Sequence, residues 1–526
     1  MKNAFVLLTT VGLSAALPHT QTMAATSENA PPIISVSLPS LAEGDASGRL
    51  LVFARPLRKD ESAAPGEVDG SENSPAAVAV AGRYVATFGP NRSVTIDLDA
   101  TDTSTSFAAL PSGQYVLQAV LDRNNDYGRF GRGPGDLVSK VLTVQIPLQK
   151  PIGITLDHAL PAVEWDSTNV SPDVRARREA ARPFLTDVEI PSPSLTKFSG
   201  RPVRLRAWVL VPPNYHAGAK QTWPVAFMCG TFSANRQQDL DLASLFAQMN
   251  QRGSIPPLIW VFLDYATITG ATEFADGVNN GPWGTALTTE LIPALEQRFR
   301  MDARPSGRLL IGHSSGGWAS LWLQINYPYL FGGAWATAPD PSDFRDFVGV
   351  DLTMARANMY YDDFGNLRPL IRSKGQVTGT IKDFVRLEET VAHTGGTFQS
   401  FDWVFSPRGP DGRPLPMFDR VTGAVDPNIV SYWRSHYDIG RLIVSLSEAQ
   451  RRALDGKLRV IVGDADTFYL DGSVHRLQRD AQTARLDAKF RFLPGKTHND
   501  LFAKDGDSLG LLKEIAWEMH AVARPH

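Results

Sequence analysis

The segment 308–317 has the residue types and spacing of a serine placed to attack acyl groups. It reads Arg-Leu-Leu-Ile-Gly-His-Ser-Ser-Gly-Gly, so that Ser314 lies between Gly312 and Gly316. The apolar residues before the serine are typical of a buried strand. Helical spacing follows at Trp318, Leu321, Trp322 and Ile325. A serine on a strand–turn–helix junction, with glycines where backbones approach closely, is the nucleophile-elbow pattern G-x-S-x-G. The segment predicts Ser314 as a nucleophile, with a chance match in a glycine-rich chain as the alternative.

The residue after this serine would supply part of an oxyanion hole. In the predicted turn, the amide of Ser315 lies at the first turn of a helix, where the backbone carries partial positive charge. Such an amide can bind the negative oxygen of a tetrahedral intermediate. We therefore expect Ser315 to act through its backbone.

A base for the serine is expected after it in the chain, on a loop that follows a later strand. His498 fits this place, because it lies in the polar loop 494–500 between a strand pattern at 488–492 and a helical pattern at 508–522. The other histidines of this part of the chain fit less well, and they are His313, His393, His436, His475 and His526. We expect His498 to be the general base, with a surface loop histidine as the alternative.

The acid of such a catalytic set should follow the apolar strand pattern at 458–462. Three aspartates, Asp464, Asp466 and Asp471, lie in the loop after it. At least one of them is expected to serve only as a turn or helix cap. The residues alone leave the choice among the three open.

The elements that position these groups alternate between strands and helices from about residue 200. Continuous apolar runs at 225–228 and 258–263 predict strands covered on both faces, and helical patterns at 240–249 and 287–299 lie between strands. This alternation predicts a mainly parallel sheet with right-handed crossovers. We expect one α/β catalytic domain over 200–526.

Residues 341–446 interrupt the alternation. The stretch is rich in aromatic residues and too long for an ordinary crossover, so we predict an insertion near the active site, a lid or pocket wall. Trp403 and Trp433 are its candidate substrate contacts. The alternative, expected for most of its aromatics, is that they form the insertion's own core.

The N-terminal part has a different pattern. Lys2, the apolar run 4–17 and the small residues around Ala24 and Ala25 predict a signal peptide over 1–25, with a membrane anchor as the alternative. Short strand patterns over 31–160 predict a small β-sandwich. The charged, proline-punctuated stretch 161–199 is predicted to be a linker that ends in an entry strand.

One loop of the predicted sandwich has acidic and amide side chains at alternate positions. It runs from Asp122 through Asn124 and Asp126, with Asp136 nearby, and it resembles the start of a calcium loop. It lacks a glutamate at the twelfth position. An Asn/Asp/Gly hairpin loop is the simpler alternative.

Composition excludes several partner classes. The 526 residues are 43% hydrophobic and 20% charged, with a formal net charge of −3, which argues against nucleic acid or an anionic membrane surface as partner. A single cysteine, Cys229, rules out an intramolecular disulfide. With no second long apolar span, we expect no membrane insertion after signal cleavage, and a periplasmic or secreted protein.

The catalytic region resembles the esterase family of α/β-hydrolases that includes esterase D, enterochelin esterase, feruloyl and acetyl-xylan esterases and the mycolyltransferases. The resemblance depends on the segments 211–215, 290–293, 312–317 and 327–332. It implies an α/β-hydrolase fold and no metal or organic cofactor. It also implies Asp466 as the orienting acid, and the amide of Thr231, after Cys229-Gly230, as the second oxyanion donor. Cys229 departs from the family's usual histidine or serine, and the insertion is larger than in esterase D.

These inferences predict an exported serine esterase that acts on a small-molecule or glycan-linked ester through an acyl-enzyme. Two alternatives stay open. One is an acyltransferase that passes the acyl group to a sugar hydroxyl, and the other is a non-catalytic carbohydrate-binding surface protein. The acyl group, the alcohol and the oligomeric state do not follow from the sequence.

Overall fold

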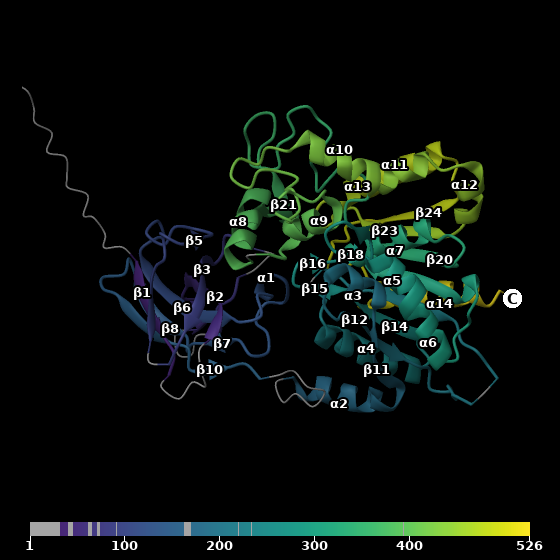
Figure 1. The fold of residues 1–526 in the computed structure, drawn as a ribbon, viewed down its shortest axis with the longest axis horizontal. Helices are drawn as coiled ribbons and strands as arrows, with labels where there is room; N and C mark the ends of the chain where they lie inside the picture. Colours follow the sequence, from purple (N-terminus) through teal and green to yellow (C-terminus); the bar gives the residue numbers. More distant parts are fainter. Residues whose placement is uncertain are drawn as a thin grey trace, which may run out of the picture.

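The computed structural model describes residues 32–39, 46–61, 66–70, 74–90, 92–161, 170–218, 220–232, 234–392 and 394–525. The predicted signal peptide, 1–25, lies outside the described residues. Among those described, no helix combines the length and apolarity needed to cross a bilayer. In Figure 1 the N-terminal sheets lie at the left and the large mixed sheet with its helices at the right.

Two β-sheets occupy the N-terminal part. The smaller has the order β4 (Ser93–Asp97), β1 (Ile33–Ser37), β9 (Ile152–Thr155). The larger has the order β10 (His158–Ala159), β7 (Leu137–Val138), β6 (Gly113–Asp122), β2 (Ala46–Pro56), β3 (Ala79–Phe88), β5 (Asp102–Thr103), with β8 (Leu142–Ile146) paired to β6. Ile34 and Val36 of the smaller sheet share one apolar core with Val52 and Leu117 of the larger. A one-turn helix, α1 (Tyr127–Phe130), follows β6.

The C-terminal part is built on one mixed sheet of eight strands. Its order is β11 (Leu185–Pro191), β12 (Arg204–Leu210), β14 (Ile259–Asp264), β13 (Val225–Cys229), β19 (Arg308–His313), β20 (Gly333–Thr337), β23 (Leu458–Gly463), β24 (Ala488–Leu493). β11, β12 and β14 pair antiparallel, and from β14 to β24 all pairs are parallel. The carboxyl ends of the parallel strands therefore meet at one edge, where loops can bring catalytic groups together.

Helices cover both faces of this sheet. They are α4 (Arg236–Gln251), α5 (Trp283–Ala286) with the π-helical turn η3 (Leu287–Leu291) and α6 (Ile292–Arg298), α7 (Ser315–Asn326), α12 (Glu448–Leu454), α13 (Leu470–Thr483) and α14 (Gly510–Ala523). Alternate residues of β14 lie in different apolar cores. Trp260 and Phe262 belong to one core, and Val261 and Leu263 belong to the other. This two-sided burial explains the continuous apolar run of that strand.

Residues 170–199 contain the predicted entry strand, but the rest of this stretch is more structured than the linker predicted over 161–199. These residues form α2 (Pro172–Ala181), the edge strand β11 and α3 (Pro193–Ser199). One of their charged residues is buried and paired: Arg178 is fully buried, and its Nε donates to Asp241 Oδ1 of α4 at 2.7 Å. Composition could not reveal this partner, because it lies 63 residues further along the chain.

The insertion 341–446 forms its own layer of short elements. They are β21 (Pro369–Ser373), β22 (Gln376–Thr380), α8 (Ile381–Val391), α9 (Thr397–Phe405), α10 (Pro427–His436) and α11 (Ile439–Val444). Most of its buried aromatic side chains join the apolar core on one face of the large sheet. Figure 1 shows α8 beside the N-terminal sheets, and Leu387 and Val391 of α8 share a core with Phe53 and Tyr127.

Candidate active site

Ser314 lies on the sharp turn between β19 and α7. Its backbone is left-handed, with φ of 56°, and its amide donates to Thr337 O at 3.0 Å. A Cβ on Gly312 would come within 2.0 Å of Gly316 O, and a Cβ on Gly316 within 2.2 Å of Cys229 O. Both glycines are therefore required by close backbone contacts, as the sequence pattern predicts.

Asp466 and His498 form a buried pair at the same edge of the sheet. His498 Nδ1 lies 2.9 Å from Asp466 Oδ2, and Asp466 is fully buried in the loop after β23. Asp466 Oδ1 accepts hydrogen bonds from the amides of Phe468 at 2.9 Å and Leu470 at 3.3 Å. These contacts fix the carboxylate against the imidazole.

The two competing aspartates of this loop have other partners. Asp464 Oδ1 accepts from the amide of Gly495 at 2.7 Å. Asp471 Oδ1 accepts from Arg372 Nη2 at 2.8 Å, and burial raises the pKa of the Asp471 carboxyl. The geometry thus places only Asp466, of the three, in hydrogen-bond contact with His498.

Asp340 is a site residue that sequence reasoning missed. The Ser314 hydroxyl donates to Asp340 Oδ1 at 3.1 Å, and the Ser315 hydroxyl donates to Asp340 Oδ2 at 2.7 Å. Among the described residues, no hydrogen bond joins Ser314 to His498. Burial raises the pKa of Asp340, and the hydrogen bond from Ser315 partly opposes this rise. Its sequence signal is its place, three residues after the end of the parallel strand β20.

A second buried acid lies near Asp340. Glu273 has a left-handed backbone, with φ of 54°, and burial together with the charge of Asp340 raises the pKa of its carboxyl. Tyr265 also lies beside this acid, and its hydroxyl donates to Gly230 O at 2.6 Å. That bond anchors the turn after β13, which carries Thr231.

His313 packs against the predicted base. Its ring centroid lies 4.4 Å from that of His498, and its Nδ1 lies 3.1 Å from Thr337 Oγ1. Burial and the neighbouring His498 lower the pKa of His313 well below its usual value. A neutral His313 adds no positive charge that would oppose protonation of His498.

A cavity of about 280 Å³ opens onto these groups, and we refer to it as the catalytic cavity. His498, Asp340 and Thr231 line its polar end. Its apolar walls include Phe384, Phe398, Phe401, Leu370 and Phe468, most of them from the insertion. The insertion therefore contributes a wall to this cavity.

The two predicted substrate contacts do not line the catalytic cavity. Trp433 is fully buried, its Nε1 donates to Ser406 Oγ at 2.8 Å, and its ring packs against Phe344 and Phe347. Trp403, although on α9, lies on another surface of that helix. The prediction for these two residues is wrong because Phe398 and Phe401 occupy the side of α9 that faces the cavity.

The loop with calcium-like spacing holds its own backbone. Asp122 accepts hydrogen bonds from the amides of Asn124, Asp126 and Tyr127, and Asp136 accepts from those of Arg123 and Gly133. Within the described ranges, no three His, Cys, Asp or Glu side chains are grouped so that they could hold a metal ion. The hairpin-loop alternative explains the contacts of these carboxylates.

The chain also matches the model of a known protein family. The family model described as "Putative esterase" matches residues 202–505. No curated protein matches the chain.

Several solved structures are similar to this one. A ferulic acid esterase superposes with a TM-score of 0.40 at 12% identity, covering 65% of this chain and 99% of its own. An S-formylglutathione hydrolase from Agrobacterium tumefaciens superposes with a TM-score of 0.36 at 14% identity, covering 64% of this chain and 94% of its own. A ferulic acid esterase from the fungus Anaeromyces mucronatus superposes with a TM-score of 0.31 at 14% identity, covering 66% of this chain and 92% of its own.

Proposed function

Because the chain belongs to the family described as "Putative esterase", whose model covers more than half of it, we propose that it is an exported serine esterase with Ser314, His498 and Asp466 as its catalytic residues. Family membership makes the chain a serine hydrolase of carboxylic esters with an α/β-hydrolase fold. The residue roles, the export and a separate N-terminal β-sandwich domain are parts of the proposal.

In the proposed reaction, Ser314 Oγ attacks the ester carbonyl while His498 Nε2 takes the hydroxyl proton. The hydroxyl turns from Asp340 toward His498 for this step, since it donates to Asp340 in the structure. Asp466 holds the Nδ1–H tautomer of His498 and stabilises the imidazolium. The amides of Thr231 and Ser315 bind the oxyanion. His498 then protonates the leaving alcohol, and water, deprotonated by the same imidazole, releases the acid from the acyl-enzyme.

The observation that carries this proposal is the 2.9 Å contact between His498 and a fully buried Asp466, beside a serine on a left-handed turn. His498 lines the catalytic cavity together with Asp340, which accepts a hydrogen bond from the Ser314 hydroxyl. Acyl transfer requires a nucleophile, a base and an orienting acid arranged around such a cavity.

Labelling by a fluorophosphonate, together with ester turnover, tests the proposal directly. Ser314→Ala should lose labelling and at least about 10⁴-fold in kcat, while keeping the wild-type melting temperature. Ser435→Ala, an exposed serine of α10, is the matched control and should react as wild type. Labelling that survives in Ser314→Ala would move the nucleophile elsewhere, and a wild-type chain that neither reacts nor turns over would favour the binding-protein alternative.

Hydrolysis and transfer differ in the fate of the acyl group. The proposal expects free acid as the main product with and without an added sugar, because water needs no binding site of its own in the deacylation step. Mass analysis of products formed with glucose as acceptor distinguishes the two reactions. A dominant glucose ester would replace the esterase by an acyltransferase.

Export is proposed from the sequence of residues 1–25. Lys2 followed by the apolar run 4–17 has the form of a signal peptide, which would deliver the chain to the periplasm or the medium. N-terminal sequencing of the protein recovered from each cell fraction tests this. A mature chain that still begins at Met1 in the cytosolic fraction would contradict it.

A further inference from the structure

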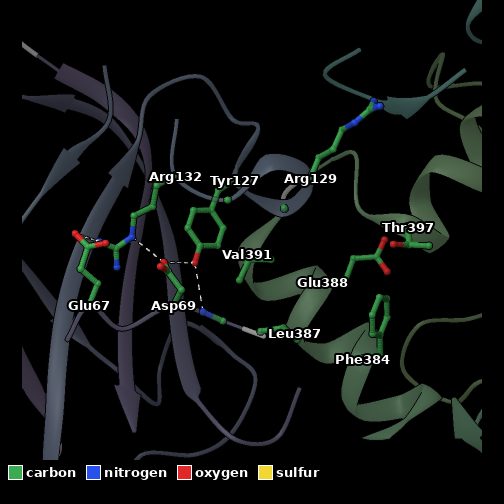
Figure 2. A pocket seen from close by; sticks show the side chains of 13 residues that line it. Glu67, Asp69, Tyr127, Arg129, Arg132, Phe384, Leu387, Glu388, Val391 and Thr397 are labelled. Carbon is green, nitrogen blue, oxygen red and sulfur yellow. Dashed lines mark hydrogen bonds and ion pairs between the residues drawn. The ribbon is translucent and has the colours of Figure 1, made fainter. Parts of the chain in front are cut away.

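Two arginines that follow β6 extend to different sides of the N-terminal part. Arg132 pairs with Glu67 at 3.3 Å and with Asp69 at 2.7 Å, both from the same part of the chain. Figure 2 shows that Arg129 extends from α1 in another direction, away from these two carboxylates. Arg129 is nevertheless buried, with only 5% of its surface exposed. The groups that surround its side chain therefore have to come from elsewhere in the chain.

The guanidinium of Arg129 contacts the C-terminal part. Its Nη1 donates to the carbonyl of Thr267 at 3.3 Å, in the short strand β15 (Ala266–Thr267) that follows β14. Its central carbon lies 5.5 Å from the centre of the Phe232 ring. Phe232 follows Thr231, the proposed oxyanion donor, and both residues line the catalytic cavity. Arg129 thus contacts the wall of this cavity next to the oxyanion donor.

The loop with calcium-like spacing fixes the helix that carries this arginine. Asp122 Oδ2 accepts a hydrogen bond at 3.0 Å from the amide of Tyr127, the first residue of α1. A Cβ on Gly128 would come within 2.2 Å of Ala392 Cβ, so α1 also lies directly against the end of α8. These contacts hold Arg129 in a fixed position relative to the C-terminal part.

The surroundings of the guanidinium are acidic. The ionisable groups whose charges act on it are Tyr265, Asp264, Glu273 and Asp239. Burial lowers the pKa of Arg129 to about 10, and the neighbouring acids oppose this fall, so the side chain keeps its positive charge at neutral pH.

The negative charge around Arg129 is reduced by burial of two of these acids. Burial raises the pKa of Asp239 to about 8. Burial and the charge of Asp340 raise the pKa of Glu273 well above its usual value, and the charge of Arg129 opposes this rise. Glu273 therefore lies within the influence of both Arg129 and the acid that binds Ser314. A positive potential remains beside the turn that carries Thr231.

We propose that Arg129 is a positioning residue for ester cleavage, which holds the turn 230–232 through Phe232 and keeps a positive charge beside the oxyanion donor Thr231. Negative charge develops on the carbonyl oxygen only as the tetrahedral intermediate forms, so this charge stabilises the transition state more than the bound ester. The inference rests on the proposed function, and it gives the N-terminal part a direct role in catalysis.

Two substitutions separate the charge of Arg129 from its bulk. Arg129→Lys keeps a positive charge, and Arg129→Met keeps a long unbranched side chain without one. With p-nitrophenyl butyrate, Arg129→Met should lower kcat roughly tenfold and change KM by less than about threefold, because an interaction of the transition state is lost. Arg129→Lys should keep kcat within about threefold of wild type. Arg132→Met, which follows in the same loop, is the matched control and should keep both constants.

A propyl trifluoromethyl ketone tests the oxyanion itself. Ser314 Oγ adds to its carbonyl carbon, the hydroxyl proton passes to His498, and the carbonyl oxygen becomes an oxyanion. The inhibition constant of this ketone should therefore rise in Arg129→Met by the factor by which kcat/KM falls, roughly tenfold. It should stay at the wild-type value in Arg132→Met. A purely structural role of Arg129 predicts a lower melting temperature without this parallel change.

The charge role of Arg129 is overturned if a folded Arg129→Met has wild-type kcat, if only its KM changes, or if Arg129→Lys loses as much as Arg129→Met. Arg129→Gln replaces Arg129→Met if the latter does not fold. If neither neutral variant folds, Arg129→Lys decides: kcat within about threefold of wild type supports the role, and a loss of about tenfold overturns it. A wild-type chain without ester turnover would overturn the proposed function and this inference together, whereas active wild type with unaffected variants would overturn the inference alone.

Discussion

The Ser314 hydroxyl donates its hydrogen bond to Asp340 in the structure, whereas in the proposed reaction His498 accepts its proton. Asp340 is buried and holds both Ser314 and Ser315, so its carboxylate aligns the elbow while it competes for the nucleophile's proton. Its charge also acts on His498, and it would favour the imidazolium of the transition state. We expect that, during catalysis, the stabilisation of the His498 imidazolium by Asp340 outweighs the competition of Asp340 for the Ser314 proton.

Asp340→Asn should therefore lower kcat by roughly tenfold, the loss expected for removing one nearby charge at the effective dielectric of a protein. It should also change stability with pH. Burial raises the pKa of Asp340, so the folded state binds this proton more tightly than the unfolded state does, and the free energy of unfolding falls as pH rises above about 4. In melting curves from pH 4 to 8, the melting temperature of Asp340→Asn should rise relative to that of wild type as pH rises. A difference in melting temperature between variant and wild type that does not change with pH would contradict a link between stability and the protonation of Asp340.

Asp466→Asn should cost about 10³–10⁴ in kcat, because the amide favours the wrong imidazole tautomer of His498. Asp464→Asn and Asp471→Asn are the matched controls from the same loop. Each should cost less than about tenfold, since their oxygens bind Gly495 and Arg372 instead. Steady-state kinetics on one ester ranks the three variants, and a larger loss at Asp471 than at Asp466 would reassign the acid.

At the scale of elements, hydrophobic patterns predicted what lies within the large sheet. The run 258–263 is a strand because both of its faces are covered, and the glycines of the elbow have no room for a Cβ. Patterns do not predict polar pairing across the chain, such as that of Arg178 in α2 with Asp241 in α4. Nor could they predict Asp340, whose partners are set by the geometry of strand ends.

The aromatic residues of the insertion show the same limit. Their number correctly predicts apolar packing, but composition does not tell which ring faces a cavity. Trp433 lies among Phe344, Phe347 and Phe405, while Phe401, on α9, faces the catalytic cavity.

Trp433→Ala should accordingly destabilise the fold by about 3–5 kcal/mol, because a large buried ring and its hydrogen bond to Ser406 are lost. Phe401→Leu should act differently and raise the KM for an aromatic acyl ester by roughly threefold to tenfold more than for an acetyl ester. Chemical denaturation and kinetics with both esters measure the two effects. Substrate-selective loss in Trp433→Ala, at wild-type stability, would contradict its assignment to the core.

At the scale of the whole molecule, the N-terminal sheets and the insertion are joined by specific contacts. Arg49 Nε donates to the carbonyl of Thr390 at 2.7 Å, and a Cβ on Gly128 would come within 2.2 Å of Ala392 Cβ. The sequence predicted both parts but not this contact, because an apolar helix face does not specify its partner.

Gly128→Val should therefore push α8 away from the sheets. We expect a larger radius of gyration in solution scattering and faster proteolysis between the two parts, together with a lower kcat/KM because α8 carries Phe384 of the catalytic cavity. Gly153→Val, on a strand of the smaller sheet where a Cβ meets nothing within 4 Å, is the control. An unchanged scattering curve together with an unchanged kcat/KM would contradict this coupling.

We expect the contact between α8 and the sheets to set an order of assembly during synthesis. Ribosomes make the chain from its N-terminus, so the strands up to β10 are complete long before residues 381–391 are made. The apolar face of α8, with Leu387 and Val391, can then dock on a surface that is already folded. A chain that starts at residue 170 would present this face to water and be prone to aggregate. The N-terminal sheets would thus act as a built-in folding template for the wall of the catalytic cavity.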